Sequence, residues 1–125
     1  MTPDAFRKIA LELPGATEAS HMNHPDFRVA GRVFATLGYP NRVTGMAKLT
    51  PLQQSQFSAA YPAVFAPIPG GWGLRGATAV KLRLATAVAV RAALFEAWRN
   101  VAPASLLRPP GLAPAPRLRR KRRAT

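Results

Sequence analysis

Cysteine is absent from this 125-residue chain, and acidic residues are scarce. Without cysteine, the chain forms no disulfide, has no thiolate nucleophile and offers no cysteine ligand to zinc. No apolar run approaches the roughly 20 residues that span a bilayer. Asp4 and Glu12 interrupt the apolar pattern of the first residues, so we expect no signal peptide there. These absences favour a soluble protein of the cytoplasm.

Basic residues are abundant instead. The chain has 18 Lys and Arg against 5 Asp and Glu, which gives a formal net charge of +13. A balance this positive favours an acidic partner, with nucleic acid as the leading candidate and an acidic protein as the alternative. If the partner is DNA, the protein would be associated with the nucleoid. Hydrophobic residues make up 48% of the chain, enough for one core, so we expect one folded domain.

The composition changes abruptly at residue 109. Four prolines fall within residues 109–116, and six of the seven residues 117–123 are Arg or Lys. Proline disfavours helix and sheet, and a block of like charges repels itself and buries no core. We predict a folded domain over residues 1–108 and a disordered basic tail over residues 109–125. Residues 1–108 keep 12 cations against 5 acids, a net charge of +7, so the domain is basic without the tail.

Hydrophobic periodicity and capping residues predict three helices and five strands. One helix begins at Thr2 and Pro3, a capping box at Thr50 and Gln53 begins the second, and the third begins near Thr86. The predicted strands cover residues 27–30, 33–37, 43–49, 64–68 and 77–84. The order α-β-β-β-α-β-β-α predicts an α+β fold, a two-layer sandwich whose helices cover one face of an antiparallel sheet.

Two of these elements indicate which side chains are buried. In strand 77–84, Val80, Leu82 and Leu84 alternate with Lys81 and Arg83, the pattern of a sheet with one buried and one solvent-exposed face. In the last helix, the apolar residues at helical spacing form one predicted core stripe. They are Val90, Leu94, Ala97, Trp98 and Val101.

The solvent-exposed face of the sheet is the first candidate binding surface, because basic residues of the strands fall on it by parity. Trp72, in the adjacent glycine-rich loop, could stack on a base. The candidate nucleic-acid-binding residues of this face and loop are Arg28, Lys48, Trp72, Arg75, Lys81 and Arg83. The alternative is a face kept soluble by its charges, with Trp72 packed at the edge of the core.

The basic tail is the second candidate. Its cations are Arg117, Arg119, Arg120, Lys121, Arg122 and Arg123. Guanidinium groups bind phosphate oxygens bidentately, and each neutralised phosphate adds roughly 0.9 to the salt dependence of binding. A tail alone would bind without sequence preference. The alternative is a solvated extension with no function.

Three other motifs do not support catalysis. Residues 70–76 are rich in glycine but lack the Gly-Lys-Ser/Thr ending of a phosphate loop and precede a strand, so we expect a close backbone approach there. His21 and His24 would point to opposite faces of one strand, which disfavours a metal site or an acid–base pair. Ser20 lacks the Gly-x-Ser-x-Gly elbow. We predict no catalytic residue, no metal and no cofactor, and an enzyme using a histidine is the least favoured alternative.

Several short motifs occur together in the order and spacing of one family. They are Leu13-Pro14-Gly15, His24-Pro25-Asp26-Phe27-Arg28-Val29, Gly31, Phe34-Ala35, Trp72-Gly73, Arg75-Gly76, Val80 and Leu82. With these motifs the chain resembles the MmcQ/YjbR family over most of residues 1–108. The resemblance implies a fold similar to that of type III secretion chaperones, often compared with the frataxin-like CyaY fold.

The same resemblance implies a function in outline. Members are commonly described as predicted DNA-binding proteins, which favours DNA over RNA, and the chaperone-like fold implies the alternative of a protein-binding module. Iron handling in frataxins uses an acidic ridge, whereas the first helix here holds only Asp4 and Glu12 beside Arg7 and Lys8, so we do not expect iron. The predicted function is a non-catalytic nucleic-acid-binding module of low sequence specificity.

Overall fold

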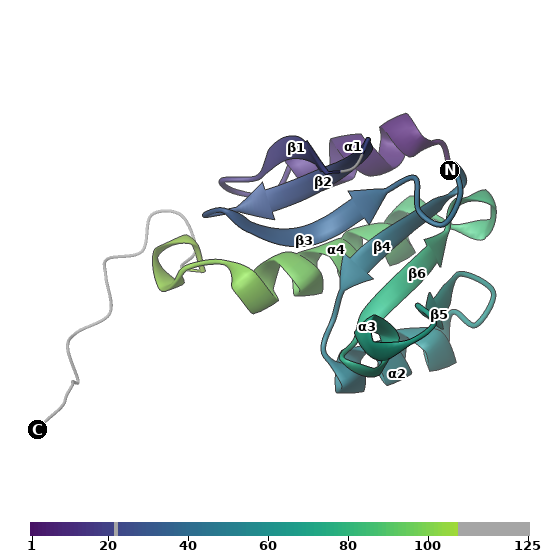
Figure 1. The fold of residues 1–125 in the computed structure, drawn as a ribbon. Coiled ribbons are helices and arrows are strands. Elements are labelled where there is room, and N and C mark those ends of the chain that lie inside the picture. The colour runs from purple at the N-terminus through teal and green to yellow at the C-terminus, as the bar shows by residue number, and fades with distance from the viewer. Residues whose placement is uncertain (22, 108–125) are drawn as a thin grey trace, which may run out of the picture.

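The computed structural model describes residues 1–21 and 23–107 (Figure 1). The helices are α1 (Pro3–Leu11), α2 (Pro51–Ala60), α3 (Gly71–Leu74) and α4 (Ala87–Val101). The strands are β1 (Thr17–His21), β2 (His24–Val29), β3 (Arg32–Leu37), β4 (Thr44–Lys48), β5 (Phe65–Pro67) and β6 (Ala77–Lys81). Two 3-10 helices, η1 (Leu82–Leu84) and η2 (Ala104–Leu106), follow β6 and α4.

The strands form an antiparallel sheet in the order β1-β2-β3-β4-β6-β5. Figure 1 shows α1, α2 and α4 behind this sheet, while the other face, called the open face below, carries no long helix. The predicted α+β sandwich with its helices on one face is therefore confirmed. Within the described residues, no helix is long and apolar enough to cross a membrane.

Threonine side chains begin the three longer helices, as predicted. Thr2 Oγ1 accepts a hydrogen bond from Ala5 N–H (3.1 Å), and Thr86 Oγ1 accepts one from Ala89 N–H (3.3 Å). At α2 the capping box is complete, because Thr50 Oγ1 accepts from the Gln53 N–H and Gln53 Oε1 accepts from the Thr50 N–H. Each such cap stabilises its helix by about 1 kcal/mol.

The long helix α4 covers the middle of the sheet. All five residues of the predicted core stripe are buried, and the small residues Ala89 and Ala93 extend that buried face. The indole N–H of Trp98 donates a hydrogen bond to the carbonyl of Pro14 (2.8 Å). The segment that follows α1 is therefore held against α4, and the two helices form one layer.

Three strands differ from the prediction, and the first of them, β2, begins at His24, three residues before the predicted strand 27–30. The edge strand β1 has the sequence Thr-Glu-Ala-Ser-His, whose single apolar residue gives no alternating pattern to detect. The predicted strand 77–84 ends at Lys81, because Lys81 pairs with Thr44, the first residue of β4, and no partner strand remains beyond it. The prediction was therefore wrong for Arg83, which lies on η1, and for Leu84, which is 59% exposed.

A β-bulge interrupts the pairing of β2 and β3. Phe27 pairs with Ala35, but Arg28 pairs with Val33, which leaves Phe34 without a register partner. Phe34 and Ala35 are consecutive in the chain, yet both are fully buried in the same core. The bulge therefore places two neighbouring residues in the core, which strict alternation along 33–37 does not allow.

The glycine-rich residues 70–76 form the short helix α3 and its flanks, where a loop was predicted. A Cβ atom on Gly73 would lie 1.6 Å from the carbonyl oxygen of Ile68, and one on Gly76 would lie 2.0 Å from that of Leu49. Gly76 also has a φ of +112°. The predicted close backbone approach is confirmed, and it brings the start of β6 against the end of β4.

Candidate nucleic-acid interface

The middle row of the open face consists mainly of short side chains. From β1 to β5 the cross-strand partners in this row are Ala19, Asp26, Thr36, Met46, Ala79 and Ala66. The phenylalanines of the strands, Phe27, Phe34 and Phe65, are at most 1% exposed and belong to the core. Among the described strand residues, no Phe, Tyr or Trp therefore lies on the open face.

Lys48 and Lys81 lie on the open face at opposite ends of two neighbouring strands. Lys81 pairs with Thr44 at the start of β4, and Lys48 pairs with Ala77 at the start of β6. Each lies two residues from the middle-row residue of its own strand, so its side chain points to the same face. Lys48 is four residues beyond Thr44, the partner of Lys81, which corresponds to about 13 Å along the strands at roughly 3.3 Å per residue. We call the two ends of the sheet the Lys48 end and the Lys81 end.

Three exposed cations lie at the Lys81 end. Lys81 closes β6, Arg83 lies on η1 immediately after it, and Arg42 lies in the turn before β4, the strand that pairs with β6. The amino group of Met1 donates a hydrogen bond to the carbonyl of Leu82 (2.8 Å) and adds a fourth positive charge. This end of the sheet is therefore positive on both strands.

The Lys48 end carries cations on successive elements. Arg28 of β2 pairs with Val33, and Ala35 of β3 pairs with Ala47, so Arg28 is level with the last residues of β4. From β2 to the start of β6, the cations at this end are Arg28, Arg32, Lys48 and Arg75.

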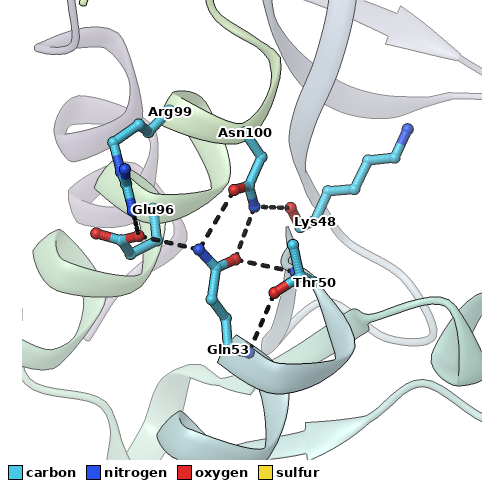
Figure 2. A network of polar contacts seen from close by, with 6 residues as sticks. All are labelled: Lys48, Thr50, Gln53, Glu96, Arg99 and Asn100. Carbon is cyan, nitrogen blue, oxygen red and sulfur yellow. Dashed lines mark hydrogen bonds and ion pairs between the residues drawn. The ribbon is translucent and has the colours of Figure 1, made fainter.

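A polar network fixes the backbone at Lys48 (Figure 2). The side-chain NH₂ of Asn100 donates to the carbonyl of Lys48 (3.3 Å) and to Gln53 Oε1 (2.7 Å). Gln53 in turn donates to Glu96 Oε1 (2.9 Å) on α4. Figure 2 shows the Lys48 side chain pointing away from these groups. The network therefore holds the end of β4 and leaves the ammonium group exposed.

Arg28 contacts a buried carboxylate. Its Nε and Nη2 atoms donate to the two oxygens of Asp26 at 2.8 and 3.0 Å, and Asp26 is 2% exposed. The hydrogen bond with Asp26 and then the attraction of its charge raise the pKa of Arg28, against a smaller opposing effect of desolvation. Because a raised pKa favours the charged form, Arg28 stays protonated up to strongly alkaline pH.

Every acidic residue of the chain has a basic partner within 4.0 Å. Arg7 on α1 contacts both Asp4 and Glu18, and the other acids contact one arginine each. The remaining pairs are Asp26 with Arg28, Glu12 with Arg91 and Glu96 with Arg99. Four arginines, three of them in the helix layer, therefore pair with all five carboxylates.

The other cations of residues 1–21 and 23–107 have no carboxylate within that distance. They are Lys8, Arg32, Arg42, Lys48, Arg75, Lys81 and Arg83. All except Lys8 lie on the strands, on η1 or in the turns beside the strands, and we call this part of the molecule the sheet side. Arg32 and Arg42 were not among the predicted residues, because parity within a strand does not reach a hairpin turn. A search for basic residues beside predicted turns would have found them.

The predicted stacking residue Trp72 lies on α3 and is 64% exposed. The alternative in which Trp72 packs at the edge of the core is therefore wrong. Its neighbour Leu74 is 82% exposed, and Arg75 ends the helix. An exposed aromatic and an exposed cation thus stand together beside β6.

His21 and His24 lie on different strands, β1 and β2, and are register partners. The prediction that one strand sends them to opposite faces was therefore wrong. The His24 ring packs edge-on against Tyr39, with ring centroids 6.1 Å apart. In the described part of the chain, no group of three His, Asp or Glu side chains is placed to hold a metal ion.

The six predicted cations of the tail, Arg117, Arg119, Arg120, Lys121, Arg122 and Arg123, lie outside the described residues. The described chain ends at Leu107, just after η2. Leu106 packs against the core, and a Cβ atom on Gly15 would lie 2.9 Å from its Cδ1. Figure 1 shows η2 near the turn between β2 and β3, at the Lys48 end.

The family model of YjbR matches residues 11–100 of the chain. The chain belongs to the YjbR family. Among solved structures, this YjbR chain is similar to Deinococcus radiodurans protein DR2400, a DUF419 domain, with a TM-score of 0.65 and 20% sequence identity over 80% of this chain and 78% of that one. This likeness shows that the two proteins share a fold. None of the curated proteins matches the chain.

Proposed function

We propose that the open face of this YjbR protein binds nucleic acid through its phosphates, with duplex DNA as the partner and with low sequence specificity. The observation that carries the proposal is the separation of charge. Each carboxylate is paired with an arginine, while six cations of the described chain without a carboxylate partner lie on the sheet side, Lys48 and Lys81 among them on the open face. Cations without an internal partner can contact phosphates with all their donors, because no internal ion pair must first be broken.

The spacing of the cations supports a duplex. Lys48 and Lys81 stand about 13 Å apart along the strands, close to the roughly 12 Å width of the major groove of B-DNA. Cations at the two ends could therefore contact the two backbones that border one groove. Between them the face has short side chains such as Ala79 and Thr36, so no bulky side chain keeps the two lysines from reaching the two backbones.

The lack of aromatic side chains on the described strands of the open face argues against single-stranded nucleic acid as the partner. Proteins that bind single-stranded nucleic acid stack successive bases on aromatic side chains. The described strands place no Phe, Tyr or Trp on the open face, and Trp72 stands beside it on α3. Lysine and arginine contacts to phosphate fix position but do not read sequence, so low specificity follows.

The second candidate is a module that binds an acidic protein. Trp72 and Leu74, exposed beside Arg75, favour it, because aromatic residues and arginine are enriched where proteins bind one another. This candidate predicts a polypeptide that stays bound to the protein after nuclease treatment. The nucleic-acid proposal predicts that nuclease releases whatever is bound.

Fluorescence anisotropy with a labelled duplex of mixed sequence, measured over a range of salt concentrations, tests the proposal. Because each phosphate contact contributes a slope of about −0.9, we expect log K to fall with log salt at a slope of about −3 or steeper. The labelled single strand should bind more weakly at every salt concentration. Absence of duplex binding at low salt, or binding that does not respond to salt, contradicts the proposal.

A further inference from the structure

Arg28 differs from the other cations of the open face because a buried group fixes its guanidinium. Both oxygens of Asp26 accept from it, at 2.8 and 3.0 Å, and the carboxylate side chain is only 3% exposed. Phe27 and Val29 on either side are buried in the core, so Asp26 and Arg28 share the open face by parity. The pair is therefore a rigid part of the sheet surface.

The pairing with Asp26 leaves part of the guanidinium available. A guanidinium carries five N–H donors, and Asp26 takes one from Nε and one from Nη2. The Nη1 donors have no partner among the described residues, and the Arg28 side chain is 35% exposed. Arg28 thus presents unused donors in a fixed direction, which reduces the side-chain entropy lost on binding an anion.

The surroundings favour an anion at this position. Asp26 is the one acidic residue in the described strands β2 to β6, and Arg28 occupies its oxygens. Arg32 and Lys48 extend the positive charge along the same end of the sheet. We propose that Arg28 is a phosphate-binding residue and that Asp26 is its positioning residue. In nucleic acid the phosphate would be a backbone phosphate, and this part of the inference rests on the function proposed above.

Two-dimensional NMR of the Nε–H groups of arginine in the full chain, with inorganic phosphate as the probe, tests the anion site directly. We expect a resolved Arg28 Nε–H signal that shifts with phosphate to saturation, while the signal of exposed Arg83 shifts weakly and without saturation. In Asp26→Asn the saturable shift of the Arg28 signal should be lost. Equal responses of Arg28 and Arg83, or an unchanged shift in Asp26→Asn, would overturn the proposal.

Measuring the duplex affinity of three variants shows whether the fixed position of the Arg28 guanidinium matters or only its charge. Arg28→Gln alone would leave Asp26 buried without a partner, so Asp26→Asn/Arg28→Gln removes both partners together. We expect this double variant to lose about tenfold in duplex affinity, the effect of one bidentate phosphate contact. Arg28→Lys keeps the positive charge but lacks the planar set of guanidinium donors, so its duplex affinity should fall between those of the double variant and the wild type. Asp26→Asn keeps Arg28 and should lose affinity for duplex while circular dichroism stays unchanged.

The two experiments separate this inference from the proposed function. If duplex binds and all three variants bind it as the wild type does, the role of Arg28 is wrong and the proposed function stands. If duplex does not bind but phosphate still shifts the Arg28 signal selectively, the anion site stands and the proposed function is wrong.

Discussion

The helix layer and the sheet side of this YjbR protein differ in what their basic side chains contact. On α1 and α4, three of four cations, Arg7, Arg91 and Arg99, bind a carboxylate. On the sheet side, one of seven described cations does so, and that one is Arg28. The difference teaches that a net charge of +13 does not describe a uniform surface. Within the described residues, the helix layer is close to neutral, and the excess of positive charge lies on the sheet side.

The two layers also differ in how they are assembled. The helix layer depends on side chains, such as Trp98 bonded to the Pro14 carbonyl and the stripe of α4. The Lys48 end of the sheet depends on backbone contact, because the start of β6 lies directly against Leu49. The changes described next test this comparison in one layer or at the contact between the two.

The largest expected effect is on the sheet side, from Gly76→Ala. A Cβ atom there would lie 2.0 Å from the carbonyl oxygen of Leu49, and φ is +112°. We expect the free energy of unfolding in urea to fall by about 3 kcal/mol or more. Gly71→Ala is the matched control, because its nearest neighbour is the flexible end of Arg75 at 3.7 Å. If both changes cost the same, the close approach does not support the sheet.

The second prediction compares charges between the layers. The triple change Lys48→Gln, Lys81→Gln and Arg83→Gln should weaken duplex binding by about 30-fold and reduce the salt slope by about 2.7. The matched triple, Lys8→Gln, Arg91→Gln and Arg99→Gln, removes the same formal charge from the helix layer. It should change affinity by less than about threefold. Equal losses in the two triples would show that only net charge matters.

The third prediction concerns the contact between the layers at Lys48. Asn100→Ala removes the bonds to the Lys48 carbonyl and to Gln53, and it should lower the free energy of unfolding by about 1 kcal/mol. Amide hydrogen exchange should accelerate around residues 48–50. Gln56→Ala, on the exposed face of α2, is the control and should change neither measurement. Unchanged exchange in Asn100→Ala would mean that the network does not hold this strand end.

The smallest effect is expected from an ion pair of the helix layer. Glu12→Gln removes the partner of Arg91, and both side chains are about half exposed. Because exposed pairs contribute little, the melting curve should correspond to a loss below about 0.5 kcal/mol. The variant frees one more cation on the helix layer, so duplex binding should stay within about twofold of wild type. A larger gain in affinity would indicate that the helix layer also contacts the nucleic acid.

The sequence predicted the parts of the fold that depend on local chemistry. The caps at Thr2, Thr50 and Thr86 need only residues within one turn, and the stripe of α4 needs only its own period. The bulge at Phe34 depends on the register between two strands, and no local pattern specifies that register. The sequence of β1 is polar, so only its pairing with β2 makes it a strand.

The sequence predicted where the candidate surface lies, but it did not predict which of the cations are paired with carboxylates. Strand parity placed Arg28, Lys48 and Lys81 on the open face. It did not separate neutralised from unpaired cations, because partners such as Glu12 and Arg91 are 79 residues apart. The Asp26–Arg28 pair is the one ion pair of the described sheet that could have been predicted from the sequence, because residues two apart on a strand face the same side.

The packing of Leu106 against the core fixes the position at which the described chain ends, at Leu107. Arg117 is ten positions further along the chain than Leu107. At no more than about 3.6 Å per residue, the covalent chain keeps Arg117 within about 36 Å of Leu107. This radius is close to one helical turn of duplex DNA, about 34 Å. If a duplex binds at the Lys48 end as proposed, the Arg-rich segment that starts at residue 117 is attached within about one helical turn of it.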